Sequence, residues 1–283
     1  MSAFQPALRA DLLRGRTAWI TGGGTGLGRA MALRFASLGA DIALCGRRRE
    51  PLESTAKEIE AVGRRAAFAT CDVRDAAQVD AALDLIEKAL TLPDILVNNA
   101  AGNFLCPSED LTPNGFDAVV RIVLHGTFHC TQAIGKKWIE AKKPGSVLSI
   151  ATTYAETGSG FVLPSACAKA GVVALTRSLA VEWARYNIRL NAISPGPIPT
   201  QGAFSRLLPT EELEQARLKR IPAGRFGTPD ELAELAAFLV SDASAWMTGD
   251  VVTIDGGEWL RGAGEFNDLV DVPKEMIAVL RKK

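Results

Sequence analysis

No charge of one sign predominates in this sequence. Its 283 residues include 32 lysines and arginines and 32 aspartates and glutamates, so the formal net charge is zero. Sequence-independent binding to nucleic acid or to a membrane surface calls for a basic excess. We therefore expect no nucleic-acid partner and no membrane partner, and any bound anion must be held by local basic clusters.

Closely spaced cysteines and long apolar segments are also missing. The five cysteines are Cys45, Cys71, Cys106, Cys130 and Cys167. They contain no C-x-x-C pair, which indicates neither a disulfide framework nor a zinc ribbon and fits a reducing compartment. No run of about eighteen apolar residues occurs, and the first fifteen residues do not resemble a signal peptide. We expect a bacterial cytoplasmic protein, and the mitochondrial matrix stays open as an alternative.

Histidine is equally scarce. His125 and His129 are the only two, and their i, i+4 spacing could place them on one helical face to bridge a metal. Neither an H-E-x-x-H acid nor an obvious third ligand accompanies them. We expect no metal site and interpret the pair as helix packing, with a subunit interface as one location for it.

What the sequence does contain is a regular alternation of short β-rich runs and stretches of helical periodicity, with 47% apolar residues to supply a core. The expected strands are Thr17 to Thr21, Asp41 to Cys45, Ala66 to Cys71, Ile95 to Asn98, Val147 to Ala151, Arg189 to Ser194 and Val251 to Ile254. The expected helices are Gly28 to Leu38, Glu50 to Val62, Ala76 to Leu90, Asn114 to Ala141, Ser165 to Arg185 and Pro229 to Leu239. This pattern predicts an α/β fold with a doubly wound parallel sheet of about seven strands, formed by residues 1–283 as one domain. The irregular segment Pro195 to Thr210 is expected to be a lid over a ligand.

A glycine-rich segment directly follows the first expected strand. It reads TGGGTGLGRA from Thr21 to Ala30, with glycines where the backbone must turn tightly and approach a pyrophosphate, and a helix N-terminus after it. A Walker loop is not indicated, because Gly28 is followed by Arg29 and Ala30 instead of Lys and Ser or Thr. A simple turn is the alternative, but the flanking strand and helix favour a dinucleotide site.

The spacing of Gly22, Gly26 and Gly28 resembles the TGxxxGxG loop of the short-chain dehydrogenases/reductases. Asp72 with Val73, the segment NNAAG from residue 98 and the segment PGPIPT from residue 195 are similar to further motifs of that family. The resemblance covers roughly residues 15 to 260 and implies a Rossmann-type fold, a nicotinamide cofactor and a homotetramer. The cofactor contacts that it implies lie at Thr21, Gly22, Gly24, Thr25, Gly26, Leu27, Arg47, Asp72, Val73, Asn99, Ala100, Lys169, Pro195, Gly196, Ile198 and Thr200.

The end of the second expected strand distinguishes the two nicotinamide cofactors. It reads LCGRRR and provides no carboxylate for an adenosine ribose. Arg47 can instead pair with a 2′-phosphate through charge-assisted hydrogen bonds. We predict NADPH/NADP as the cofactor; the alternative is a solvated charge run that opens a surface helix.

The family's Tyr-x-x-x-Lys motif is altered here, since Ser165 stands four residues before Lys169 where a tyrosine is expected. A serine hydroxyl is too weak an acid to protonate a ketone oxygen near neutral pH, so ordinary alcohol and ketone interconversion is disfavoured. Lys169 shares a helical face with Ser165, and the resemblance implies that it holds the nicotinamide ribose. Ser165 either contacts substrate or serves as an N-cap after Pro164.

Only two tyrosines can supply the missing phenol. Tyr154 follows the fifth expected strand in the loop ATTYAETGSG, at the end of the sheet where ligands bind. Tyr186 ends a helix and is interpreted as packing or capping. Tyr154 is therefore the candidate acid or oxyanion donor. Asn103 follows the glycine of NNAAG, where an asparagine that favours a turn is the ordinary interpretation.

Longer segments resemble the 2,4-dienoyl-CoA reductases of the mitochondrial type. They are NNAAGNF from residue 98, YAETGSGF from 154, PSACAKAGV from 164, PGPI from 195, GAFSR from 202 and GEFNDL from 264. The resemblance implies that Tyr154 and Asn103 hold a thioester oxygen, with Thr152 or Thr153 near the place of the family's usual serine. It also implies substrate contacts, each with a packing or surface role as its alternative, at Arg74, Phe104, Thr112 and Arg206.

These residues suit one reaction. Hydride delivered to the far end of a conjugated dienoyl thioester pushes negative charge onto the thioester oxygen, and two preorganised donors stabilise the resulting dienolate. We therefore expect an NADPH-dependent reductase that converts a 2,4-dienoyl-CoA into an enoyl-CoA during β-oxidation of unsaturated fatty acids, with an acyl-CoA thioester as its partner. The alternatives are a 2-enoyl-CoA reductase, a carbonyl reductase that uses Tyr154 as its acid, and a non-catalytic NADP-binding sensor.

Overall fold

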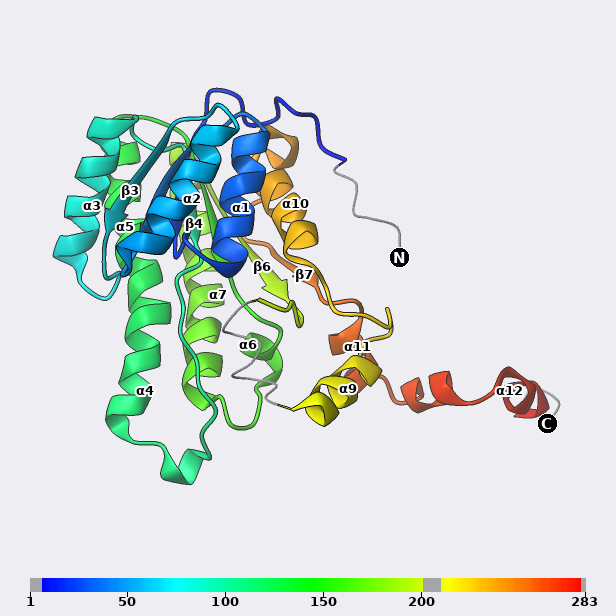
Figure 1. Ribbon diagram of the computed structural model, residues 1–283. Coiled ribbons are helices and arrows are strands. Elements are labelled where there is room, and N and C mark those ends of the chain that lie inside the picture. Colours follow the sequence, from blue (N-terminus) through cyan, green and yellow to red (C-terminus); the bar gives the residue numbers. More distant parts are fainter. Residues whose placement is uncertain (1–6, 201–209, 281–283) are drawn as a thin grey trace.

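Seven parallel strands form one sheet at the centre of the molecule (Figure 1). The structure, a computed structural model, describes residues 7–200 and 210–280. In spatial order the strands are β3 (Ala66–Thr70), β2 (Asp41–Gly46), β1 (Thr17–Thr21), β4 (Ile95–Asn98), β5 (Gly145–Ile150), β6 (Ile188–Pro195) and β7 (Val251–Ile254). All pairings are parallel, and the order reverses between β1 and β4. The expected doubly wound sheet is confirmed; β1, β4 and β7 have the expected bounds, and the ends of the other strands differ by at most two residues.

Helices cover both faces of the sheet, because alternate side chains along each strand point to opposite sides. On β1, Trp19 packs with α3 (Ala76–Ala89), α5 (Gly126–Glu140) and α7 (Leu163–Trp183). Its neighbour Ile20 packs on the other face with α1 (Gly26–Ser37), α2 (Arg49–Ala61) and α10 (Pro229–Val240). The two apolar clusters make the central strands rigid supports for the loops at their ends.

The long helix expected over Asn114 to Ala141 is interrupted. It consists of α4 (Pro113–Val120), a π-helical turn (Arg121–His125) and α5. Within this region the Thr127 hydroxyl donates to the carbonyl oxygen of Val123 at 2.7 Å. Single π turns of this kind occur often near functional sites.

Several short elements were not expected. They are α6 (Tyr154–Thr157), α9 (Glu211–Lys219), α11 (Glu258–Ala263), α12 (Lys274–Leu280) and 3₁₀ turns at Ser108–Asp110, Ala184–Tyr186, Asp242–Ser244 and Asn267–Asp271. Tyr154 therefore begins a short helix and does not lie in an open loop. The segment from α11 to α12 extends away from the sheet (Figure 1).

One interpretation of Ser165 is wrong. Helix α7 begins at Leu163 with Val162 as its N-cap residue, so Ser165 lies inside the first turn and does not cap the helix. The cause is Pro164, which fits the first turn of a helix because its missing N–H has no intrahelical partner there. The Ser165 side chain is free to make a different contact.

Within residues 7–200 and 210–280, no helix is both long enough and apolar enough to cross a lipid bilayer.

Candidate active site

The glycine-rich loop between β1 and α1 has the geometry of a phosphate cradle. Gly22 and Gly26 adopt φ angles of 64° and 54°, which favour glycine. A Cβ on Gly28 would lie 2.4 Å from the carbonyl oxygen of Gly22, so this position tolerates only glycine. The first turn of α1 has no side-chain cap and no acidic residue, which leaves its N–H groups to an anion. The residues present thus fit a dinucleotide.

Residues after β4 hold this loop in place. The Asn99 amide donates to the Thr21 carbonyl oxygen at 2.9 Å, and the Asn99 and Ala100 N–H groups donate to the Thr21 hydroxyl at 3.0 and 2.9 Å. Thr200 lies beside Gly26, since a Cβ on Gly26 would meet its side chain at 3.5 Å. Three segments of predicted cofactor residues therefore meet at the carboxyl end of the sheet.

The predicted adenine end of the site carries a cluster of charges. Asp72 accepts hydrogen bonds from Arg74, with Nε 2.9 Å from both carboxylate oxygens. The Arg74 guanidinium, with a smaller contribution from Arg47, lowers the pKa of Asp72. Arg47 itself is exposed. Arg74, predicted as a substrate contact, is thus paired with Asp72, while Arg47 has a guanidinium that is open to solvent.

Three of the four predicted catalytic residues converge on one hydroxyl group. The Tyr154 hydroxyl lies 3.0 Å from the Ser165 hydroxyl and accepts a hydrogen bond from the Asn103 amide at 3.4 Å. The side-chain oxygen of Asn103, Oδ1, accepts a hydrogen bond from the Phe104 N–H at 2.9 Å. This bond orients the side-chain amide so that its NH₂ group faces Tyr154. Helix α6 presents the tyrosine, the loop after β4 presents the asparagine, and α7 presents the serine. The Asn103 amide and the Tyr154 hydroxyl thus form a pair of donors, and the Ser165 hydroxyl contacts the tyrosine of that pair.

Lys169 lies one turn further along α7. Its side chain is buried, and its ammonium donates to the carbonyl oxygen of Ile150 at the end of β5. Burial disfavours the charged form and lowers the pKa of Lys169 from 10.5 to about 8. The lysine is therefore held on the side of the helix that carries Ser165, close to the carboxyl end of β5.

The remaining predicted residues have separate roles or lie elsewhere. Thr112 is the N-cap of α4 and accepts from the Gly115 N–H at 3.1 Å. Phe104 is partly exposed next to Asn103. His129 contacts the carbonyl oxygen of Val73 through Nδ1 at 2.9 Å, and its ring lies 6.3 Å from that of His125. Arg206, most of the expected lid and the GAFSR segment lie outside the described residues.

A contact that the sequence did not indicate joins the two loops of the site. The Cys106 N–H donates to the carbonyl oxygen of Phe161 at 2.9 Å, and Phe161 has a φ of 65° despite its large side chain. The only signal in the sequence is the aromatic residue that ends GSGF, and no periodicity assigns it a role.

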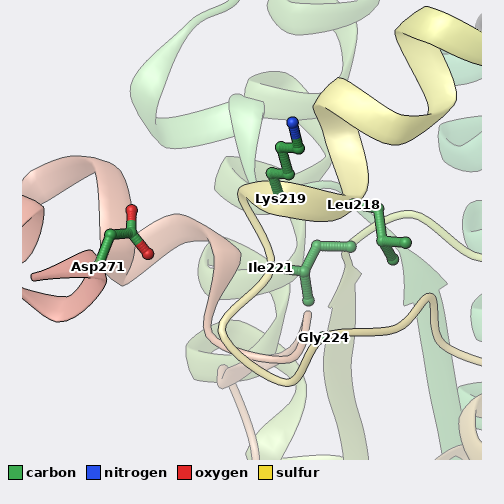
Figure 2. Close-up of a pocket in the computed structure, with 5 residues that line it drawn as sticks. All are labelled: Leu218, Lys219, Ile221, Gly224 and Asp271. Carbon is green, nitrogen blue, oxygen red and sulfur yellow. The ribbon is translucent and has the colours of Figure 1, made fainter. Parts of the chain in front are cut away.

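One hollow on the surface of the described residues lies apart from this cluster. It has a volume of about 420 Å³ and is lined by Leu218, Lys219, Ile221, Gly224 and Asp271 (Figure 2). In Figure 2, Asp271 lies at the left, apart from the other four residues, and it is paired with Arg261. A reaction site needs several polar groups that converge on one point. The lining of this hollow lacks such a group of side chains, so we do not regard it as the reaction site.

Comparison with known proteins agrees with the geometry. A family model described as Enoyl-(Acyl carrier protein) reductase matches residues 22–258. A Bacillus subtilis protein named probable 2,4-dienoyl-CoA reductase [(2E)-enoyl-CoA-producing] is 49% identical over 85% of this chain and 95% of its own length. A Danio rerio protein named peroxisomal 2,4-dienoyl-CoA reductase [(3E)-enoyl-CoA-producing] is 36% identical over 99% of this chain and 93% of its own.

Solved structures show the same fold. A short chain dehydrogenase from Bacillus anthracis is 44% identical, with a TM-score of 0.79 over 86% of this chain and 96% of that chain. A putative 2-deoxy-D-gluconate 3-dehydrogenase from Agrobacterium tumefaciens with bound NADP is 34% identical, with a TM-score of 0.81 over 89% and 99%.

Proposed function

Since this chain belongs to the short-chain dehydrogenase/reductase family, we propose that it is an NADPH-dependent 2,4-dienoyl-CoA reductase that serves the oxidation of unsaturated fatty acids. The observation that carries the proposal is the convergence of the Asn103 amide and the Tyr154 hydroxyl, 3.4 Å apart. Relatives that bear this enzyme's name match most of the chain. Reduction of a ketone needs an acid that protonates its oxygen, and this chain has Ser165 where the family places the tyrosine that does so.

The cofactor residues are the phosphate cradle of Thr21, Gly22, Gly24, Thr25, Gly26 and Leu27, with Asn99, Ala100 and Thr200 beside it. When bound, the reduced nicotinamide supplies the hydride. Asp72 and Val73 contact the adenine, and Lys169 donates to the nicotinamide ribose. Pro195 ends β6, Gly196 and Ile198 follow it, and these three residues hold the nicotinamide end.

The two donors act on the acyl group. As a conjugated dienoyl thioester is reduced at its far carbon, charge moves to the thioester oxygen, where the Tyr154 hydroxyl and the Asn103 amide donate to it. Ser165 keeps the Tyr154 hydroxyl oriented through their 3.0 Å contact. A proton then reaches a carbon of the dienolate and not its oxygen, so the tyrosine–lysine acid of the family is not needed. For Arg74, and for Arg206 outside the described residues, the family resemblance implies a role in binding the CoA phosphates, and for Phe104 and Thr112 a place along the acyl group.

A thioester panel tests this function. With NADPH in excess, we expect the absorbance of the conjugated dienoyl-thioester band to fall for a 2,4-dienoyl-CoA, with turnover of 2-enoyl-CoA and 3-ketoacyl-CoA lower by at least about 100-fold. Turnover confined to the enoyl or ketoacyl thioesters would replace the proposal with one of its alternatives. Tight NADP binding without any turnover would indicate a sensor.

Arg47→Ala tests the choice of cofactor. We expect KM for NADPH to rise roughly 10- to 100-fold, because a charge-assisted hydrogen bond to the 2′-phosphate contributes about 1.5–3 kcal/mol, while NADH kinetics stay unchanged. The matched control is Arg48→Ala, which removes the next exposed arginine. Steady-state kinetics with both cofactors give the answer, and equal effects on NADPH and NADH would contradict the assignment.

We also propose a homotetramer in the bacterial cytoplasm. Large exposed apolar side chains such as Val181 on α7 and Trp246 before β7 support association with further copies. All five cysteines are free, and free thiols are typical of proteins in a reducing compartment.

A further inference from the structure

Four large apolar side chains near the donor pair are exposed, three of them in the loops after β4 and α6 and one at the start of α7. They are Phe161 at 61%, Leu105 at 50%, Leu163 at 41% and Phe104 at 38% of their full exposure. We call them the apolar rim. Exposed apolar side chains that lie together beside polar groups are typical of ligand-binding grooves. We propose that the rim binds the hydrocarbon tail of the acyl thioester and that Phe161 and Leu163 set the preference for long chains. This inference rests on the proposed function.

The rim is tied to the reacting groups by the chain itself. Phe104 follows Asn103 directly, and Leu163 lies two residues before Ser165, so their Cα atoms are at most about 4 and 7 Å from those of Asn103 and Ser165. The 2.9 Å hydrogen bond from the Cys106 N–H to the Phe161 carbonyl oxygen holds the two loops together. An acyl group whose thioester oxygen is bound by Tyr154 and Asn103 therefore has apolar side chains from both loops within reach.

Phe161 shows strain that its own packing does not explain. Its φ of 65° is rare for a large side chain, yet the ring it places gains little burial. Gly158 and Gly160 lie in the same loop, and glycine would adopt this conformation without strain. Strained residues of this kind cluster at ligand sites. A ligand that covers the ring supplies the missing reason for a phenylalanine at this position.

The acyl tail is favoured over other apolar occupants because the rim continues the donor site. The described part of these two loops contributes three charged side chains, the exposed carboxylates of Glu109, Asp110 and Glu156, and Glu156 is paired with Arg177 of α7 at 3.3 Å. Glu109 and Asp110 repel the CoA phosphates, so the nucleotide must leave in another direction and the uncharged tail occupies the rim.

The test compares Phe161→Ala and Leu163→Ala on 2,4-hexadienoyl-CoA and 2,4-decadienoyl-CoA at saturating NADPH. For each variant we expect kcat/KM on the ten-carbon substrate to fall about tenfold, because the longer tail loses its apolar contact, and kcat/KM on the six-carbon substrate to stay within about twofold. Phe161→Leu keeps an apolar group and should recover most of the selectivity. Leu85→Ala, which truncates an exposed leucine on α3, is the matched control and should change neither value.

Each outcome decides the matter. If the ratio of kcat/KM between the ten-carbon and six-carbon substrates is unchanged in both alanine variants, the rim does not bind the acyl tail, and the proposed function stays intact. The same conclusion follows if both substrates lose equally, or if the variants instead change the oligomeric mass measured by light scattering. Failure of the wild-type protein to reduce either dienoyl thioester overturns both proposals together. If Phe161→Ala does not fold, as judged by thermal unfolding, Leu163→Ala gives the answer alone.

Discussion

Replacing Tyr154 by phenylalanine is expected to lower kcat for a 2,4-dienoyl-CoA by roughly 100- to 1,000-fold, the usual effect of removing one donor to a developing oxyanion. The substitution removes the hydroxyl that lies 3.0 Å from Ser165 and 3.4 Å from Asn103 and keeps the ring. Because the thioester oxygen gains its charge in the transition state, KM for the thioester should change much less than kcat. Single-turnover kinetics with NADPH bound in advance measures the reducing step directly.

The sequence provides a matched control for this experiment. Tyr186→Phe removes the hydroxyl of the only other tyrosine, whose ring packs against Arg185 at 5.2 Å. That variant should keep the wild-type kcat, and both variants should bind NADPH as wild type does. A Tyr154→Phe enzyme that retains kcat within about threefold would remove the tyrosine from the mechanism, since a lost oxyanion donor costs far more.

Replacing Lys169 by methionine should have two large effects of opposite kinds. We expect kcat/KM for NADPH to fall roughly 10- to 100-fold, because hydrogen bonds from the ammonium to the ribose are lost. At neutral pH the same change should remove the cost of a buried charge, since methionine has a similar shape and no charge.

The pH dependence of unfolding separates this second effect. Burial lowers the pKa of Lys169 to about 8 in the folded protein, whereas it is 10.5 without burial. Below pH 8 both states carry the proton, and the full cost of burying it is present. Between about pH 8 and 10.5 the folded state releases the proton first, so the wild-type protein gains stability as the pH rises, by up to about 3 kcal/mol. The methionine variant lacks this gain.

Urea unfolding of both proteins at pH 7.5 and pH 10 measures the difference. Lys136→Met, at an exposed position on α5, is the control and should follow the wild-type pH dependence. If the Lys169→Met protein shows the same rise in unfolding free energy as wild type, the lysine is not the group that titrates, and the burial argument fails.

Much of the fold could be predicted because its signals are local. Each of the seven strands is a short apolar run bounded by turn residues, and the long helices show apolar positions at helical spacing. The π turn at Arg121–His125 escaped prediction because one extra residue per turn barely changes the apolar spacing of a helix. Helix α9 escaped it because the segment EELEQARLK buries none of its side chains and so carries no amphipathic signal.

For the candidate site, too, the sequence predicted some features and missed others. Residue type and local order were enough to propose Tyr154 and to doubt the ordinary chemistry of the family at Ser165, whereas the roles of Asn103 and Lys169 came from the family resemblance. The error at Ser165 came from a local signal as well, because Pro164 was taken to lie before the helix when it lies inside its first turn. Neither the pairing of Arg74 with Asp72 nor the bond between Cys106 and Phe161 could be predicted, because hydrogen-bond partners depend on side-chain positions in space.

The sequence by itself therefore determined the parallel sheet and the glycine-rich loop, because strand periodicity and glycine conformation are properties of neighbouring residues, and it named the candidates for the reacting groups. Only the tertiary structure brought the Asn103 amide and the Ser165 hydroxyl to the same phenol, from positions 51 and 11 residues away. It also decided the burial that lowers the pKa of Lys169 and the exposed rim around the donor pair. These properties depend on which distant segments exclude water from one another, and that is settled when the sheet and its helices pack.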